Sequence, residues 1–121
     1  MAVVPIDFLN FSTSILNNNS SEIIRRNAIS RSYYAVYTNA INLKNKFGLP
    51  TYSDHRSHSA LQTALKNHSD RRLKLLSARI KIAHSKRIIC DYKLDENVTM
   101  SDARQSLVFN QKIFNDITSM L

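Results

Sequence analysis

The sequence predicts an all-α protein, an up-and-down bundle of about five helices with a long second helix. The 121 residues include only one glycine and two prolines, whereas a β-protein needs turn residues about every 8–12 positions. Apolar residues recur at helical spacing in five stretches, and short polar runs separate them. Hydrophobic residues make up 43% of the chain, as in ordinary globular proteins. We therefore expect one helical domain over residues 1–121.

The first two predicted helices span residues 5–16 and 21–47. Pro5 suits the first turn of a helix, and the polar run 17–20 ends this helix and offers caps to the next. Gly48 and Pro50 end the second helix in the usual order. Residues 30–37 are apolar or aromatic on nearly every face, which predicts a buried central helix.

Three further helices are predicted over residues 54–67, 70–90 and 99–121. Ser69 or Asp70 can cap the fourth helix. Thr99 and Asp102 resemble a capping box, with aspartate in place of the usual glutamate or glutamine. The polar and acidic residues 91–98 predict a loop between the last two helices.

The chain is strongly basic. It has 17 lysines and arginines against 9 aspartates and glutamates, a formal net charge of +8. This charge favours an anionic partner, nucleic acid ahead of a membrane or an acidic protein. Residues 71–90 contain no acid, so Arg71, Arg72 and Lys74 are predicted contacts to RNA, with a solvated helix face as the alternative. The basic residues of this run are Arg71, Arg72, Lys74, Arg79, Lys81, Lys86 and Arg87.

The remaining composition favours a cytoplasmic location. Cys90 is the only cysteine, so an internal disulfide is excluded and a reducing compartment fits. No uncharged apolar run approaches the roughly 20 residues of a membrane helix. The first seven residues lack the basic region of a signal peptide.

Two segments resemble one protein family when they are taken together. Residues 30–35 read Ser-Arg-Ser-Tyr-Tyr-Ala, and residues 87–92 read Arg-Ile-Ile-Cys-Asp-Tyr. They are similar to the Ser-Arg-x-Tyr-Tyr-Ala and Arg-x-x-Ala-Asp-Tyr patterns of the HEPN superfamily of helical bundles, with Cys90 in place of alanine. His58 stands where many members carry a histidine. The resemblance covers about residues 6–121.

The resemblance implies a bacterial or archaeal protein of a toxin–antitoxin or phage-defence system. Such bundles usually form homodimers, and many are metal-independent endoribonucleases that need no cofactor. The implied partners are RNA or a nucleotide, an antitoxin, or a nucleotidyltransferase. The alternative is a non-catalytic HEPN scaffold that docks such a partner protein.

HEPN ribonucleases carry an arginine followed after about four to six residues by a histidine, and the motif has two placements here. In the first, Arg79 precedes His84, with Ile80 in place of the usual polar residue. Five helical residues turn about 500°, so these side chains would lie about 140° apart and would meet only across a dimer interface or at a helix irregularity. In the second, Arg87 is the family arginine and Tyr92 replaces the histidine.

The chemistry explains why the family uses these residue types. Imidazole titrates near neutral pH and suits proton transfer, while guanidinium holds phosphate in a bidentate fork. Tyr92, with an ordinary pKa near 10, would be a poorer base. The placement at Arg87 and Tyr92 fits the rest of the resemblance better, and His84 is then a surface residue on a basic helix.

A polar cluster is predicted where the second and fourth helices pack. Arg31 in the buried helix needs a partner, and Asp91 is the predicted one, so that the pair would hold the loop after the fourth helix. The same packing gathers Tyr34, Arg87 and Tyr92. This arrangement is either a structural ion pair or a candidate phosphate or nucleotide site.

No metal site is predicted. His55, Arg56 and His58 lie close together in the sequence, but no second pair of ligands accompanies them. We interpret these three as solvated residues. Tyr52 and Tyr92, near loops, are candidates for stacking on an RNA base.

Overall fold

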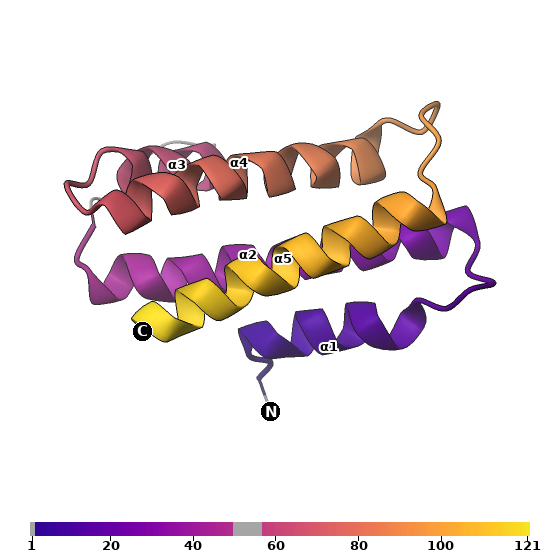
Figure 1. The fold of residues 1–121 in the computed structure, drawn as a ribbon, viewed down its shortest axis with the longest axis horizontal. Helices are drawn as coiled ribbons and strands as arrows, with labels where there is room; N and C mark the ends of the chain where they lie inside the picture. Colours follow the sequence, from indigo (N-terminus) through magenta and orange to yellow (C-terminus); the bar gives the residue numbers. More distant parts are fainter. Residues whose placement is uncertain (1, 50–56) are drawn as a thin grey trace.

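The structure is a computed structural model that describes residues 2–49 and 57–121 (Figure 1). All regular secondary structure within these residues is helical. The predicted all-α bundle with a long second helix is therefore confirmed. The five helices are α1 (Pro5–Ile15), α2 (Glu22–Lys46), α3 (Ser57–Lys66), α4 (Arg71–Tyr92) and α5 (Met100–Met120).

Helix α2 is the centre of the bundle and contacts each of the other four helices. Figure 1 shows three layers, with α3 and α4 on one side of the α2–α5 pair and α1 on the other. The prediction of a central second helix agrees with this arrangement.

The contacts of α2 give the directions of its neighbours. Tyr34 of α2 contacts Arg87 of α4, and the earlier residue Arg26 contacts the later residue Cys90. Helix α4 is therefore antiparallel to α2. Tyr33 meets His58 at the start of α3. Phe47 lies 6.0 Å from His68 beyond the end of α3, so α3 runs parallel to α2. Strict up-and-down alternation is interrupted at this short helix.

The core is built from apolar side chains at helical spacing on all five helices. Complete burial of one leucine or isoleucine side chain stabilises a fold by about 1.5–3 kcal/mol, so this interior holds the layers together. The largest fully buried apolar residues are Tyr33, Val36 and Leu43 of α2, Leu61 and Leu65 of α3, Leu73, Leu76 and Ile80 of α4, and Ile113 and Ile117 of α5.

The predicted caps form at the starts of α4 and α5, whereas α2 begins after Ser21 without a side-chain capping bond. The Asp70 side chain accepts a hydrogen bond from the Arg72 amide, at 2.9 Å. Thr99 and Asp102 form the predicted capping box, with reciprocal bonds of 3.0 and 2.9 Å. Gly48 follows α2 with φ of +63°, a conformation that only glycine adopts without strain. Pro50 and residues 54–56 of the predicted third helix lie outside the described residues.

Two sequence predictions about this part of the fold are wrong. Helix α4 continues through Asp91 and Tyr92, which were predicted to begin a loop. The extra residues place Asp91 one turn beyond Arg87, where the two side chains pair. Arg31, predicted to be buried in α2, is exposed, and Arg26 is the arginine of this helix that is buried, with 5% of its surface exposed.

Arg26 closes the carboxyl end of α4. Its guanidinium donates hydrogen bonds to the carbonyl oxygens of Ile89 and Cys90, both at 3.1 Å, and of Lys93 at 3.2 Å. A further bond goes to the carbonyl of Glu96. Carbonyl groups in the last turn of a helix have few donors within the helix, although the Ile89 oxygen also accepts from the Lys93 amide. A cation at this end also complements the helix dipole.

The five helices in the described part of the chain are also too polar or too short to span a membrane.

Candidate functional site

Aromatic and titratable side chains from α2, α3 and α4 meet halfway along the bundle. We call this group the histidine cluster, and it consists of Tyr33, Tyr34 and Tyr37 from α2, His58 from α3, and His84 and Arg87 from α4. The three helices that supply it can be followed in Figure 1.

Helical spacing explains how these residues reach one place. Tyr33 and Tyr37 are four residues apart and share one face of α2, and His84 and Arg87 are three apart and share one face of α4. Because α3 runs parallel to α2, its first turn brings His58 to the same point.

The two histidines form the centre of the cluster. The rings of His58 and His84 are stacked, with centroids 4.9 Å apart and planes 13° from parallel. The hydroxyl oxygen of Tyr33 lies 2.7 Å from Nδ1 of His58, and its ring lies 5.5 Å from both imidazole centroids. Tyr37 packs against His58 with centroids 4.1 Å apart. Both histidines are half-buried, so the pair borders on solvent.

Arg87 is held beside the histidines by two side chains. Its Nε donates to Oδ2 of Asp91 at 2.8 Å, and its Nη2 donates to the hydroxyl of Tyr34 at 2.7 Å. Ser30 donates to the same Asp91 oxygen at 3.2 Å. Nη1 of Arg87 has no hydrogen-bond partner among the residues that the structure describes. The guanidinium therefore keeps donors for a bound anion, although only 8% of Arg87 is exposed.

A second arginine lies on the outer side of this group. Cζ of the exposed Arg31 is 5.0 Å from the ring centroid of Tyr34, and Cζ of Arg87 is 5.2 Å from it. Both contacts are of the cation–π kind. Tyr34 thus contacts two guanidinium groups, one exposed and one buried.

The cluster lowers the pKa of both histidines. Burial is the largest cause at His58, followed by the charges of His84 and Arg87, and together they lower its pKa to about 4. Burial and then Arg87 lower the pKa of His84. Both rings are therefore neutral at neutral pH in the absence of a ligand.

The hydroxyl of Tyr33 determines which nitrogen of His58 carries the proton. Burial, and next the neighbouring Tyr37, raise its pKa well above the usual value, so its hydroxyl stays protonated. When this O–H donates to Nδ1 of a neutral His58, the imidazole carries its own proton on Nε2. Two neutral imidazoles and a guanidinium form a set that can move protons beside a phosphate ester.

The structure does not bring together Arg79 and His84, the pair of the first placement of the motif. Arg79 extends toward α5, where its Nη2 lies 2.7 Å from Oδ2 of Asp116, whereas His84 faces α2 and α3. The helix between them is regular, so they lie on different faces as the spacing predicts. His84, expected to be a surface residue, is half-buried in the cluster and borders on solvent.

The second placement brings its two residues close together. The ring centroid of Tyr92 lies 5.6 Å from Cζ of Arg87, and 66% of Tyr92 is exposed. The predicted pair of Arg31 and Asp91 is wrong. Asp91 pairs with Arg87 and Ser30 instead, because the exposed face of α2 carries Arg31 away from it.

The predicted RNA contacts at the start of α4 lie far from the cluster. Arg71 and Arg87 are 16 residues apart, or about 24 Å along the helix. Arg71 is exposed, and Arg72 pairs with Asp70 at 2.8 Å. Nζ of Lys74 donates to the carbonyl oxygen of Lys66 at 3.2 Å.

His58 is the site residue whose environment the sequence interpretation missed. It was expected to be solvated, but it is half-buried against Tyr33, Tyr37 and His84. Its position in the family pattern was the available signal. Tyr52, His55 and Arg56 lie outside the described residues. Within those residues no group of three or more His, Cys, Asp and Glu side chains is arranged to hold a metal ion.

Comparisons of the chain with protein-family models, with curated proteins and with solved structures found no match.

Proposed function

We propose that this protein is a HEPN-like, metal-independent endoribonuclease whose active site is the histidine cluster. The observation that carries the proposal is the stacked pair of His58 and His84 beside Arg87. The site takes its histidine from one placement of the family motif and its arginine from the other. Hence His84 and Arg87 act together, while Arg79 and Tyr92 lie outside the reacting groups.

Cleavage of RNA at this site requires two proton transfers. A base removes the proton of a ribose 2′-hydroxyl, and the 2′-oxygen attacks the adjacent phosphorus. The bond from phosphorus to the 5′-oxygen breaks, and an acid gives a proton to that oxygen. The products are a 2′,3′-cyclic phosphate and a free 5′-hydroxyl.

The histidine pair supplies both proton transfers. One imidazole is neutral and accepts the 2′-hydroxyl proton. The negative phosphate favours the charged form of the other imidazole and so raises its pKa when RNA binds. Arg87 donates to the phosphate oxygens, on which negative charge increases during the reaction.

The biological setting of the proposal is a bacterial toxin–antitoxin or phage-defence system. The sequence patterns at residues 30–35 and 87–92 support this setting. A homodimer, and an antitoxin or nucleotidyltransferase partner, belong to the same proposal.

The test is cleavage of end-labelled RNA in the presence of EDTA. The wild type should cleave and leave 2′,3′-cyclic phosphate ends. His84→Ala and His58→Ala should each lose about 100-fold or more of the rate, since general acid–base groups contribute about 10²–10⁴-fold.

His68→Ala is the matched control, because His68 lies beyond α3 and contacts Phe47 instead of the cluster. It should retain the wild-type rate. An inactive wild type would contradict the proposal, as would equal rates for His84→Ala and His68→Ala.

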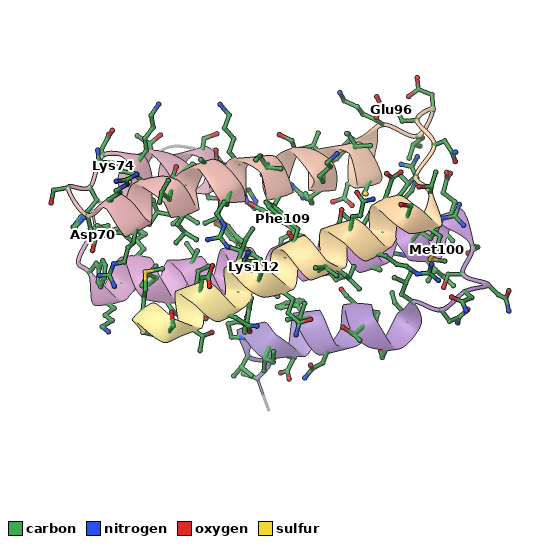
Figure 2. The ribbon with its side chains drawn as sticks, in the orientation of Figure 1. Asp70, Lys74, Glu96, Met100, Phe109 and Lys112 are labelled. Carbon is green, nitrogen blue, oxygen red and sulfur yellow. The ribbon has the colours of Figure 1, made fainter. Side chains whose placement is uncertain are left out.

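The second candidate function is the non-catalytic scaffold that docks a partner protein. It is favoured by a shallow apolar depression of about 410 Å³ along α5, formed around Val108 and Phe109. Val108 is 70% exposed, and Figure 2 marks Phe109 and Lys112 on this helix. Under this alternative the cellular function is lost in Val108→Glu and survives in His84→Ala.

A further inference from the structure

A groove of about 490 Å³ runs between α3 and α4. Its walls carry Lys66 on α3 and Lys74 and Lys81 on α4, together with the hydroxyl groups of Ser59 and Thr63. No residue that lines it is acidic. A groove of this volume lies within the range of ligand-binding sites.

The groove has free donors for an anion. The three lysines are exposed, and none forms an ion pair with an acidic side chain in the described part of the chain. Lys74 uses one donor on the carbonyl of Lys66, which leaves its other two N–H groups available. Nε2 of Gln62, also in the wall, is enclosed and has no partner among the described residues.

The groove runs along α3 and α4 toward the histidine cluster. Because α3 and α4 are antiparallel, Lys66 meets Lys74 at one end, and Ser59 and Lys81 lie toward the other. Ser59 is adjacent to His58 in sequence, and His84 lies one turn beyond Lys81. Lys74 and His84 are ten residues apart, or about 15 Å along α4.

Figure 2 helps to orient this path. It marks Asp70 and Lys74 at one end of the α3–α4 layer and Glu96 at the opposite end of α4. The end of the groove at Lys66 and Lys74 is therefore near the α3–α4 turn, and the stacked histidines lie farther along α4.

We infer that this groove binds the phosphate backbone of single-stranded RNA and guides the strand to His58 and His84. The lysines bind successive phosphates, and the hydroxyl groups bind phosphate or ribose oxygens. Lysines bind phosphates of any sequence, so the groove gives affinity without base preference. This inference rests on the proposed ribonuclease function and adds its substrate-binding track.

The test compares two triple variants with the same loss of charge. The groove variant is Lys66→Gln, Lys74→Gln and Lys81→Gln. The control variant is Lys46→Gln, Lys93→Gln and Lys112→Gln, whose lysines are exposed and lie outside the groove. Both are made with His84→Ala so that bound RNA stays intact, and both are checked for a wild-type circular dichroism spectrum.

The measurement is the affinity for a short labelled single-stranded RNA over a range of salt concentrations. The groove variant should bind about tenfold or more weakly than the control variant. Each lost phosphate contact removes about 0.7 from the slope of log affinity against log salt, so three contacts should reduce the slope by about 2. Equal affinities and equal slopes for the two variants would overturn the inference.

Two further results separate this inference from the function itself. With His84 restored, the groove variant should raise the KM for long RNA much more than the KM for a dinucleotide, because a dinucleotide occupies only the cluster. If RNA binding depends on the groove but the wild type fails to cleave RNA, the groove remains an RNA-binding site and the proposed ribonuclease activity is rejected. Polyglutamate that competes as strongly as RNA would reject RNA as the ligand of the groove.

Discussion

Two buried arginines cross between α2 and α4, and their partners differ. Arg26 and Arg87 are 5% and 8% exposed. Arg26 donates only to backbone carbonyls at the end of α4. Arg87 donates to the side chains of Tyr34 and Asp91 and lies beside two imidazoles.

The difference separates a structural arginine from a candidate functional one. Nη1 and Nη2 of Arg26 are both committed to carbonyl oxygens, and its Nε lies 3.7 Å from Glu22, so the guanidinium has little capacity for a ligand. Arg87 is held in place by side chains and has Nη1 without a partner among the described residues. Burial alone would not distinguish the two arginines, but the type of hydrogen-bond partner, backbone for Arg26 and side chain for Arg87, does distinguish them.

The largest expected effect on stability is that of Arg26→Met. The change leaves the carbonyl oxygens of Cys90 and Glu96 without the donor that Arg26 supplies. Unsatisfied buried polar groups cost about 1–3 kcal/mol each. We expect the free energy of unfolding to fall by about 3 kcal/mol in urea denaturation. Arg71→Met, at an exposed arginine, is the control. Equal denaturation midpoints for the two variants would remove the structural role of Arg26.

Tyr34→Phe should have a smaller effect on stability and a measurable effect on activity. It removes the hydrogen bond from Arg87, which costs about 1 kcal/mol, and leaves the guanidinium less firmly positioned. We expect about a tenfold lower rate of RNA cleavage. Tyr37→Phe is the matched control, because the Tyr37 hydroxyl has no hydrogen bond with a described residue. A rate equal to that of Tyr37→Phe would show that Arg87 needs no such support.

The histidine cluster should make stability depend on pH. The folded protein disfavours protonation of His58, whose pKa falls to about 4, while the unfolded chain protonates near the ordinary value of about 6.5. The unfolded state then binds more protons, so stability declines as the pH falls from about 6.5 toward 4. We expect a loss of order 1 kcal/mol, since the ring is partly solvated.

The corresponding measurement is the thermal midpoint over this pH range. His58→Gln should flatten the profile, whereas His68→Gln should not. A wild-type midpoint that is constant from pH 6.5 to pH 4 would contradict the buried, neutral histidine pair.

The smallest effect is expected for Arg79→Gln. This change breaks the ion pair with Asp116, whose side chains are 30% and 46% exposed, and such pairs contribute less than about 1 kcal/mol. RNA cleavage should be unchanged, because Arg79 faces α5. Loss of cleavage in this variant would instead favour the first placement of the motif, at Arg79 and His84.

The sequence predicts where the helices begin and end better than it predicts which face of each helix points inward. Proline, glycine and capping residues determine where helices begin and end, so the boundaries of α1, α2, α4 and α5 were predicted to within two residues. Buried residues of helix α2 include polar ones and lie on several of its faces, so periodicity does not indicate which arginine points inward. Arg26 and Arg31 differ by five residues, or about 140° around the helix, and packing against α4 selects Arg26.

Sequence patterns also did not predict the stacked histidine pair. The stacking of His58 on His84 depends on α3 running parallel to α2. The direction of a short helix after a long connection is set by tertiary packing, and periodicity carries no information about it. The grouping of Tyr34, Arg87 and Asp91 followed from helical spacing and the expected packing of α2 against α4.

The most direct test of the account is the rate of RNA cleavage per folded molecule in Arg26→Met and Arg87→Gln. The folded fraction of each variant is measured by circular dichroism under the assay conditions. We expect Arg26→Met to keep the wild-type rate per folded molecule and Arg87→Gln to lose about 100-fold or more, as when a transition-state donor is removed. Equal losses in both variants would contradict the assignment of Arg87 to the active site.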